Sequence, residues 1–373
     1  MAPVVAALRR RSEVFVVRTC ATAQHREMLD QVLDVFGIVP DVDLDLMQPG
    51  QALSALGARV LAAMDDVLVA EQPDWVLVQG DTTTVMMTAL AAQHRQIRVG
   101  HVEAGLRTYD RRNPFPEEMN RVVTDHVSDL CFAPTMTARA NLLAEGIADR
   151  RIVVTGNTVI DALLAVARQP WSPPVGDVLA DLPTDRRWLL VTAHRRESFG
   201  EPLAAICQAL RRIAQQWGDR VHIVYPVHRN PNVWGPVHSA LADIPGITLL
   251  PPVDYRALVY LMQRCTLILT DSGGIQEEAP SLGKPVLVLR EVTERPEAVE
   301  AGTARVVGTD PDRIAAAVTE LLTDPVAYRR MSRAINPYGD GQAAERIAEA
   351  LLAASSASSP LTRLPSPTPS SAC

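Results

Sequence analysis

The sequence predicts an α/β fold made of two Rossmann-like, doubly wound parallel-sheet domains that face a common cleft. The chain has 373 residues, and at roughly 100–200 residues per domain this length suits two domains. Short apolar runs rich in β-branched residues alternate with stretches of helical length, which is typical of parallel sheets. Aromatic residues make up only 4% of the chain, so the core must consist mainly of Ala, Val, Leu and Ile, which suits a parallel sheet covered by helices.

The predicted strands form two series, one for each domain. The first series is Val14–Thr19, Trp75–Val78, Ile97–Val102, Leu130–Ala133 and Ile152–Thr155. The second series is Trp188–Thr192, Val221–Val227, Ile247–Leu250, Leu267–Thr270, Val286–Leu289 and Ala304–Val307. Apolar residues recur with helical spacing in the segments between strands, among them Gln51–Glu71, Thr83–Gln93, Pro202–Gln216 and Arg313–Leu322.

Composition divides the chain into four parts. We predict an N-terminal domain over residues 1–157, a second domain over residues 158–336, a helix over residues 337–354 and a disordered tail over residues 355–373. A Pro-rich stretch begins the second domain, and a turn-rich segment precedes the final helix. The tail holds seven Ser and four Pro among 19 residues, so it cannot bury enough apolar surface to offset the entropy of ordering.

Charge and composition exclude several classes of function. The net charge is -7, which argues against broad nucleic-acid binding. A membrane-spanning helix needs about 18 consecutive apolar residues, and the sequence has no such run. It also shows no secretory signal, so we expect a cytoplasmic protein. The five cysteines are scattered, and we interpret the first four as small core residues rather than as zinc ligands or disulfides.

Polar residues follow the predicted strands directly, at the edge where open parallel sheets bind ligands. Ser272, Gly273 and Gly274 lie between a strand and a helix start, where free N–H groups attract a phosphate. The alternative is that this glycine turn is only a tight helix cap without a ligand. Glu278 can accept hydrogen bonds from a ribose diol, or be a solvated helix carboxylate. Arg295 can pair with a diphosphate, or form a surface ion pair.

Three carboxylates in segments that read as loops are candidates for acid–base catalysis. Asp81, Glu103 and Glu117 are these candidates, because an acid just past a buried strand is partly desolvated and its pKa rises. Asp81 can instead be a helix N-cap. Glu103 and Glu117 can instead form structural ion pairs with Arg107 and Arg121, respectively.

Two histidines receive different interpretations. His194 stands at a strand end among charged neighbours and is a candidate site residue, with a structural hydrogen-bonding role as the alternative. His101 lies inside an apolar strand, and we interpret it as a core histidine with satisfied hydrogen bonds.

Longer motifs carry a resemblance to a known family. They are residues 22–30, Gln79–Thr84, His101–Thr108, Pro116–Arg121, Thr155–Ala162, His194–Gly200, Tyr225–His228, Asp271–Pro285, Thr293–Gly302 and Asn336–Gly341. In this order they resemble the non-hydrolysing UDP-N-acetylglucosamine 2-epimerases, from Met1 to about Leu352. The resemblance implies the two-domain, GT-B-like fold of many nucleotide-sugar glycosyltransferases, a cleft site, a final helix returning to the first domain, and a homodimer.

The resemblance also implies the chemistry. UDP-N-acetylglucosamine would lose its C2 proton and UDP in an anti elimination, and UDP would add back with the proton on the opposite face, without NAD or metal. Removing a proton from one face of the sugar ring and delivering one to the other requires at least two acid–base groups. Asp81, Glu103 and Glu117 match the family's carboxylates. The resemblance places the remaining predicted residues at the substrate: His194, Arg121, Val253, Leu258, Ser272, Gly273, Gly274, Glu278 and Arg295.

The chain departs from the family pattern in two places. Val253 and Leu258 stand where members often carry a polar and an aromatic residue near the uracil, so base contacts would be mainly apolar and main-chain. At the start, Met1–Leu8 matches the middle of the family's first helix, and the preceding strand and its basic loop are absent. Because the first strand of a doubly wound sheet is central, we expect Met1 to be an internal methionine and the natural chain to begin upstream.

Other functions remain open from the sequence. A hydrolysing relative would release free N-acetylmannosamine and UDP, and a glycosyltransferase of the same fold would need an acceptor. A non-catalytic nucleotide-sugar sensor would bind without exchanging the C2 proton. The presence of three carboxylates and His194 favours the epimerase over the sensor.

Overall fold

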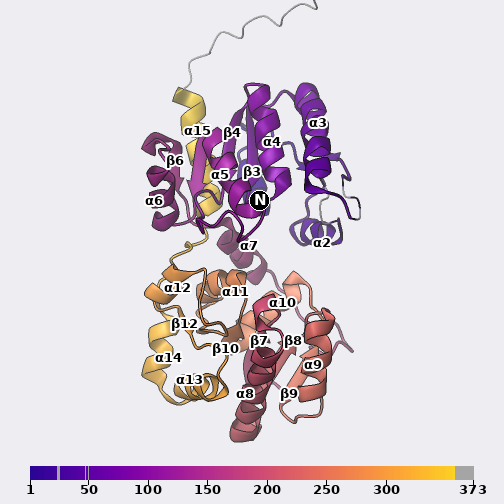
Figure 1. Ribbon diagram of the computed structural model, residues 1–373, viewed down its shortest axis with the longest axis vertical. Helices are drawn as coiled ribbons and strands as arrows, with labels where there is room; N and C mark the ends of the chain where they lie inside the picture. The colour runs from indigo at the N-terminus through magenta and orange to yellow at the C-terminus, as the bar shows by residue number, and fades with distance from the viewer. Residues whose placement is uncertain (23–25, 47, 49, 358–373) are drawn as a thin grey trace, which may run out of the picture.

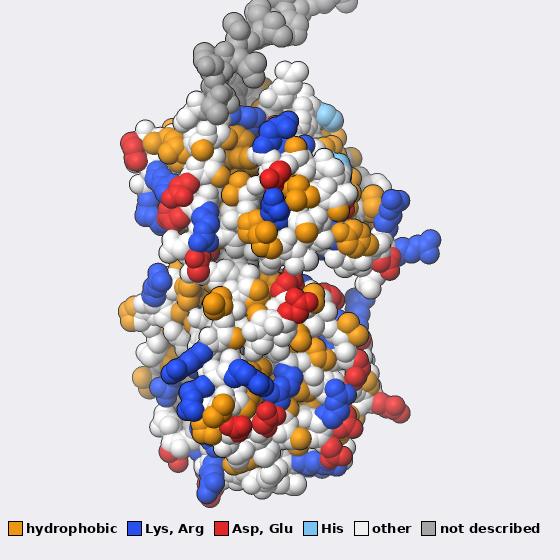
Figure 2. Space-filling model, turned by 90° about the vertical axis from the view of Figure 1, so that its left-hand side faces the viewer, with side chains coloured by type: hydrophobic (Ala, Val, Ile, Leu, Met, Phe, Trp, Pro, Cys, Tyr) orange, Lys and Arg blue, Asp and Glu red, His pale blue; other side chains and the backbone are white. Residues whose placement is uncertain are grey.

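Two parallel β-sheets, each flanked by helices, form the upper and lower lobes of the computed structural model (Figure 1). The structure describes residues 1–22, 26–46, 48 and 50–357. Residues 23–25 of the motif 22–30 and residues 358–373 of the predicted tail lie outside this part. Figure 2 shows the lobes meeting at a waist, with a notch open between them on one side.

The N-terminal sheet has the strand order β3-β4-β5-β6, all parallel. Its strands are β3 (Trp75–Gln79), β4 (Arg98–Val102), β5 (Leu130–Ala133) and β6 (Ile152–Val154). Its helices are α3 (Leu53–Glu71), α4 (Thr83–His94), α5 (Glu117–Val127) and α6 (Met136–Ala144). Helix α7 (Thr158–Ala167) follows β6, lies between the lobes and packs Ile160 and Leu163 into the core of the C-terminal lobe. These four strands agree with the predicted series to within one residue at most ends, because each is a short apolar run bounded by helix caps.

The prediction of a first strand at Val14–Thr19 is wrong. Pairing begins only at β1 (Cys20–Ala21), which joins β2 (Val42–Asp43) in a separate two-stranded sheet beside α2 (Arg26–Phe36). Val16 is 93% exposed. A β-branched run forms a strand only where a neighbour supplies ladder partners, and β3 is the edge strand of its own sheet. Cys20 is therefore exposed, contrary to its predicted place in the core, whereas Cys131, Cys207 and Cys265 are buried as predicted.

The C-terminal sheet has six parallel strands in the order β12-β11-β10-β7-β8-β9, the doubly wound arrangement that the sequence predicts. Its strands are β7 (Arg187–Thr192), β8 (Val221–Pro226), β9 (Ile247–Leu250), β10 (Cys265–Thr270), β11 (Val286–Val288) and β12 (Ala304–Val306). Its helices are α8 (Glu201–Trp217), α9 (Pro231–Leu241), α10 (Tyr255–Arg264), α11 (Gly273–Glu278), α12 (Pro296–Glu300), α13 (Pro311–Thr323) and α14 (Pro325–Ser332). The strand order reverses between β7 and β10, so a crevice opens at the carboxyl ends of these two strands.

The last helix, α15 (Ala343–Ala357), returns to the N-terminal lobe, as predicted (Figure 1). It packs with α1 (Ala2–Arg9) in one apolar cluster that includes Val4 and Ile347. It continues to Ala357, three residues beyond its predicted end. Within the described ranges, no helix is long and apolar enough to cross a membrane.

The chain crosses between the lobes at two segments that touch each other. The Asn157 N–H donates to the carbonyl of Tyr338 over 2.7 Å. A Cβ atom on Gly156 would lie 3.2 Å from the Cα of Gly339, and both glycines have positive φ angles. Only residues without a Cβ allow this approach, so the glycines bring the two crossings together.

Candidate active site

Asp271 joins the two loops at the switch point of the C-terminal sheet. It follows β10 and is fully buried. Its Oδ2 accepts the backbone N–H groups of His194 (2.7 Å) and Arg195 (2.8 Å), which follow β7. Its Oδ1 has no hydrogen-bond partner among the described residues and lies 3.8 Å from His194 Nδ1. The buried carboxylate therefore fixes the His194 loop and faces its ring.

His194 lies in an environment that disfavours its protonated form. Burial lowers the pKa of His194 below its ordinary value of 6.5, the Asp271 carboxylate opposes this, and His228 and Arg195 add to the lowering. The His194 and His228 rings are stacked with centroids 5.3 Å apart. A neutral imidazole next to a carboxylate can accept a proton and then be stabilised as a cation.

Two guanidinium groups flank the glycine turn at the start of α11. A Cβ atom on Gly273 would lie 3.6 Å from the Arg295 guanidinium carbon and 3.9 Å from a terminal nitrogen of Arg195. Ser272 precedes the helix, but its side chain makes no capping hydrogen bond. The first N–H groups of a helix have no partner inside the helix. With two cations close to them, these groups make an arrangement suited to a diphosphate.

Arg195 is a residue that the sequence reasoning did not single out. Its Nε is buried without a hydrogen-bond partner among the described residues. Its position directly after His194 was the available signal, but a run of charged residues in a loop does not tell which of them turns inward.

Glu278 is buried, so its interpretation as a solvated helix carboxylate is wrong. It is 8% exposed and accepts a hydrogen bond from the Tyr255 hydroxyl over 2.7 Å. Burial raises the pKa of Glu278 to about 7; the Tyr255 hydrogen bond opposes this rise and Glu277 adds to it. Val253, Tyr255 and Leu258 are partly buried and pack against one apolar cluster of the C-terminal lobe.

Asp81 and Arg121 form an ion pair on the N-terminal lobe. The Arg121 guanidinium lies 2.5 Å from Asp81 Oδ2 and 3.2 Å from Glu118 Oε2. Asp81 is not the helix cap, because Thr82 caps α4 by accepting the Val85 N–H. Arg121, predicted to bind substrate, is thus held by two carboxylates at this edge.

Glu103 stands at the end of β4 in a left-handed conformation, with φ +69°. Its predicted alternative, an ion pair with Arg107, is wrong, because Arg107 pairs with Asp125 and Glu145. Glu103 instead accepts a hydrogen bond from Gln79 over 3.4 Å. Burial raises its pKa, with a further increase from Glu277, whereas Gln79 and Arg295 lower it.

Glu117 begins α5 and is half-buried. Its alternative ion pair with Arg121 is not formed, because Arg121 contacts Glu118 instead. Glu118 is buried and accepts the backbone N–H groups of Thr108 and Tyr109. Glu118 therefore has a structural role, whereas the adjacent Glu117 keeps part of its surface exposed.

Glu277 connects the two lobes beside these residues. Its carboxylate accepts hydrogen bonds from Asn157 (2.7 Å), at the start of α7, and from Arg295 (2.5 Å). Gln79, which donates to Glu103, also donates to the hydroxyl of the residue after Asn157. These contacts bring the Glu103 loop of the N-terminal lobe close to the Glu277–Arg295 ion pair of the C-terminal lobe. The interdomain edge therefore brings together acid–base groups and a candidate diphosphate site.

A cavity of about 560 Å³ lies elsewhere, at the crossing of the two chain segments. Its lining includes Thr135, Gly156, Asn336 and Arg346, and none of the predicted site residues. The strand-end side chains, and not this cavity, define the candidate site.

Comparison with known proteins gives a consistent result. A family model described as UDP-N-acetylglucosamine 2-epimerase matches residues 6–352. The enzyme of that name from Escherichia coli (strain K12) is 56% identical over 356 residues, covering 94% of each chain. The one from Bacillus subtilis (strain 168) is 49% identical, covering 94% of this chain and 91% of the relative. A Neisseria meningitidis UDP-GlcNAc 2-epimerase, solved with UDP-GlcNAc bound, matches with a TM-score of 0.83 at 44% identity, covering 95% of this chain and 96% of that one.

Proposed function

Because this chain belongs to the UDP-N-acetylglucosamine 2-epimerase family, we propose that it inverts C2 of UDP-N-acetylglucosamine to give UDP-N-acetylmannosamine, without hydrolysis and reversibly. One observation carries the proposal. Contacts through Gln79, Asn157 and Glu277 bring the Glu103 loop of one lobe close to Arg295 and the glycine turn of the other. One bound molecule can therefore present its sugar to that loop and its diphosphate to the glycine turn.

The proposed reaction has two halves. In the first, a base removes the C2 proton, and the electron pair of the C2–H bond forms the C1–C2 double bond. The C1–O bond breaks, and its electron pair leaves on UDP. In the second, a UDP oxygen attacks C1 and an acid delivers a proton to C2 on the opposite face. Asp81, Glu103 and Glu117 supply the acid and base groups.

The C-terminal lobe would stabilise the leaving UDP. Negative charge grows on the diphosphate as the C1–O bond breaks, and groups fixed in advance stabilise it best. His194, Arg295 and the N–H groups of Gly273 and Gly274 are proposed for this role, and Arg195 joins them because its guanidinium flanks the same turn. Glu278, with Val253 and Leu258 nearby, is proposed to hold the nucleoside.

A single incubation tests the reaction. With UDP-N-acetylglucosamine in D₂O, we expect NMR to show UDP-N-acetylmannosamine with deuterium at C2. Free N-acetylmannosamine would instead indicate a hydrolysing enzyme. Binding without C2 exchange would indicate a sensor, and either result would refute the proposal.

Substitution of the carboxylates tests their roles. Asp81→Asn, Glu103→Gln and Glu117→Gln are each expected to lower turnover by about 10²–10⁴-fold, the usual worth of acid–base catalysis. Glu300→Gln, at an exposed position on α12, is the matched control and should turn over normally. Unchanged turnover in one of the three variants removes that residue from the mechanism.

A homodimer and a cytoplasmic location are further proposals, made on the family resemblance. Light scattering of the purified chain at micromolar concentration tests the first, with a monomer as the contradicting result. Fractionation of cells expressing the chain tests the second.

A further inference from the structure

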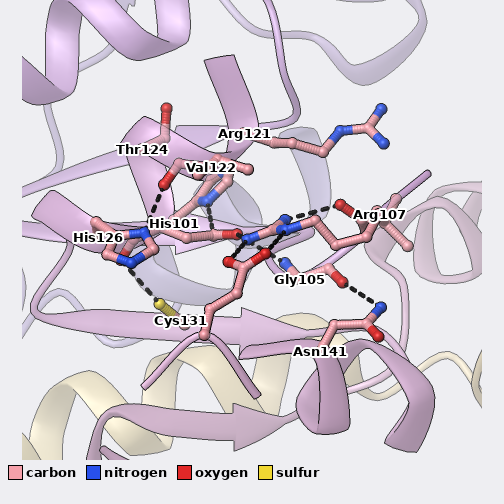
Figure 3. A network of polar contacts seen from close by, with 12 residues as sticks. His101, Gly105, Arg107, Arg121, Val122, Thr124, His126, Cys131 and Asn141 are labelled. Carbon is pink, nitrogen blue, oxygen red and sulfur yellow. Dashed lines mark hydrogen bonds and ion pairs between the residues drawn. The ribbon is translucent and has the colours of Figure 1, made fainter. Parts of the chain in front are cut away.

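A buried network of ion pairs lies behind the loops that carry Asp81 and Glu103. Figure 3 shows His101, Gly105 and Arg107 converging within it. The side chains of His101, Asp125 and Arg107 are all 0% exposed, and that of Glu145 is 20% exposed. Such a network must be nearly complete in its hydrogen bonds, because an unmatched charge in the interior is costly.

The partners of His101 decide its protonation state. Its Nδ1 lies 2.6 Å from Asp125 Oδ1, and its Nε2 lies 2.7 Å from the carbonyl oxygen of Gly80. A carbonyl oxygen can only accept, and so can an ionised carboxylate. A neutral imidazole donates from one nitrogen only, so two acceptors require a ring that carries a proton on both nitrogens.

Asp125 is the partner that stays ionised. Its Oδ2 accepts hydrogen bonds from Arg107 (2.7 Å) and from the Gly105 N–H (3.1 Å). Burial by itself would raise the pKa of Asp125, but His101 and Arg107 lower it overall. A proton on Asp125 instead would leave the buried Arg107 guanidinium, 2.7 Å away, without the charge of this partner.

The charges of the network balance only if His101 is a cation. Asp125 from α5 and Glu145 after α6 are negative, and Arg107 from the loop after β4 is positive. Cys131 of β5, which also packs here, stays a neutral thiol because burial raises its pKa. A positive His101 gives two charges of each sign, which is the arrangement that a buried network favours.

The network holds both carboxylate loops in place. His101 fixes the Gly80 carbonyl, directly before Asp81, and Asp125 fixes the Gly105 N–H, two residues after Glu103. Gly80, Glu103 and Gly105 all have positive φ angles. A glutamate in this conformation is strained and persists only when its surroundings determine it, and here one carboxylate organises both loops.

We propose that His101 is a buried imidazolium that acts as a positioning residue, setting the distance between the Asp81 and Glu103 loops through Gly80 and Asp125. This inference rests on the proposed function for its kinetic consequence. It does not rest on it for the protonation state, which belongs to the chain without substrate.

The first test is spectroscopic and uses the wild-type chain. With ¹⁵N-labelled histidine, His101 should show two protonated ring nitrogens at neutral pH. His222 is the matched control: it is a buried strand histidine whose Nε2 contacts Thr248, whose Nδ1 finds no partner in the described residues, and whose pKa is lowered by burial. It should show one protonated nitrogen. A single protonated nitrogen in His101 overturns the proposal.

The second test is kinetic. In His101→Gln the amide NH₂ can donate to either Asp125 or the Gly80 carbonyl, and the amide oxygen then faces the other acceptor. The Asp81 and Glu103 loops should therefore shift. We expect kcat to fall by roughly 100-fold, the usual cost of a small misplacement of reacting groups, with KM and UDP affinity nearly unchanged. His222→Gln should keep the wild-type kcat. A folded His101→Gln chain with wild-type kcat overturns the proposal.

The two ways of failing are distinguishable. If the wild-type chain does not epimerise UDP-N-acetylglucosamine, the proposed function fails, while the ¹⁵N spectrum still decides the charge of His101. If the wild type is active and His101 is neutral, only the inference fails.

Discussion

Glu278 is a buried carboxyl whose protonation depends on the fold. Its pKa is raised from an ordinary 4.5 to about 7 because burial disfavours the carboxylate; the Tyr255 hydroxyl limits the rise and Glu277 adds to it. Between these two pH values the folded chain keeps a proton that the unfolded chain has released. The folded state therefore loses stability as pH rises through this window.

Glu278→Gln should remove this dependence. Its amide oxygen can still accept from Tyr255, but it carries no charge. Relative to the variant, the wild type should lose about 3 kcal/mol between about pH 4.5 and about pH 7, from 1.36 kcal/mol per pKa unit. Thermal midpoints measured across this range check it, with the exposed Glu13→Gln as control. A wild type that gains stability relative to Glu278→Gln with rising pH contradicts the argument.

Helix α15 depends on a residue from the middle of the chain. Asp161, on α7, accepts the N–H groups of Ala343 (3.2 Å) and Ala344 (2.9 Å) at the start of α15. A helix start leaves N–H groups without partners inside the helix, and a side-chain oxygen usually supplies one from nearby. Here the cap comes from another helix, so capping also docks the start of α15 on α7.

Removal of this cap should weaken the docking. Asp161→Ala is expected to lower the free energy of unfolding by about 1–2 kcal/mol, the upper range for a lost cap. Urea denaturation followed by circular dichroism measures it. Asp243→Ala, at an exposed position, should stay within about 0.5 kcal/mol of wild type. Equal stability of Asp161→Ala and wild type would show that α15 docks by apolar packing alone.

At the scale of the element, apolar spacing predicts most strands and helices. It is wrong where a segment needs a neighbouring strand to pair with and has none. Trp75–Gln79 and Leu130–Ala133 form as expected, because both are apolar runs with neighbours in the sheet. Val14–Thr19 is also rich in β-branched and aromatic residues but does not form a strand. The pattern indicates which residues can pair, and only the assembled sheet provides the partner.

At the scale of the whole molecule, a substrate bound between the lobes should protect both. UDP alone should slow hydrogen exchange at residues 193–198 and 271–278, next to the glycine turn. UDP-N-acetylglucosamine should also slow it at residues 79–84 and 102–108, because its sugar would reach the N-terminal carboxylates. Mass spectrometry measures hydrogen exchange with each ligand, and the exchange rate of α13 should stay unchanged as the control. Protection by the sugar nucleotide confined to the C-terminal lobe would contradict a site shared by both lobes.

The sequence by itself determined the class of fold and which polar residues follow the strands. Alternating apolar runs and helical stretches specify parallel sheets, and polar residues after the strands must lie at one edge. The tertiary structure decided which charges meet. Arg107 binds Asp125 and Glu145 instead of Glu103, Arg121 binds Glu118 and Asp81 instead of Glu117, and His101 gains its second acceptor from Gly80. The spacing of residues specifies local structure, whereas several of these partners come from segments far apart in the chain that only the packed fold brings together.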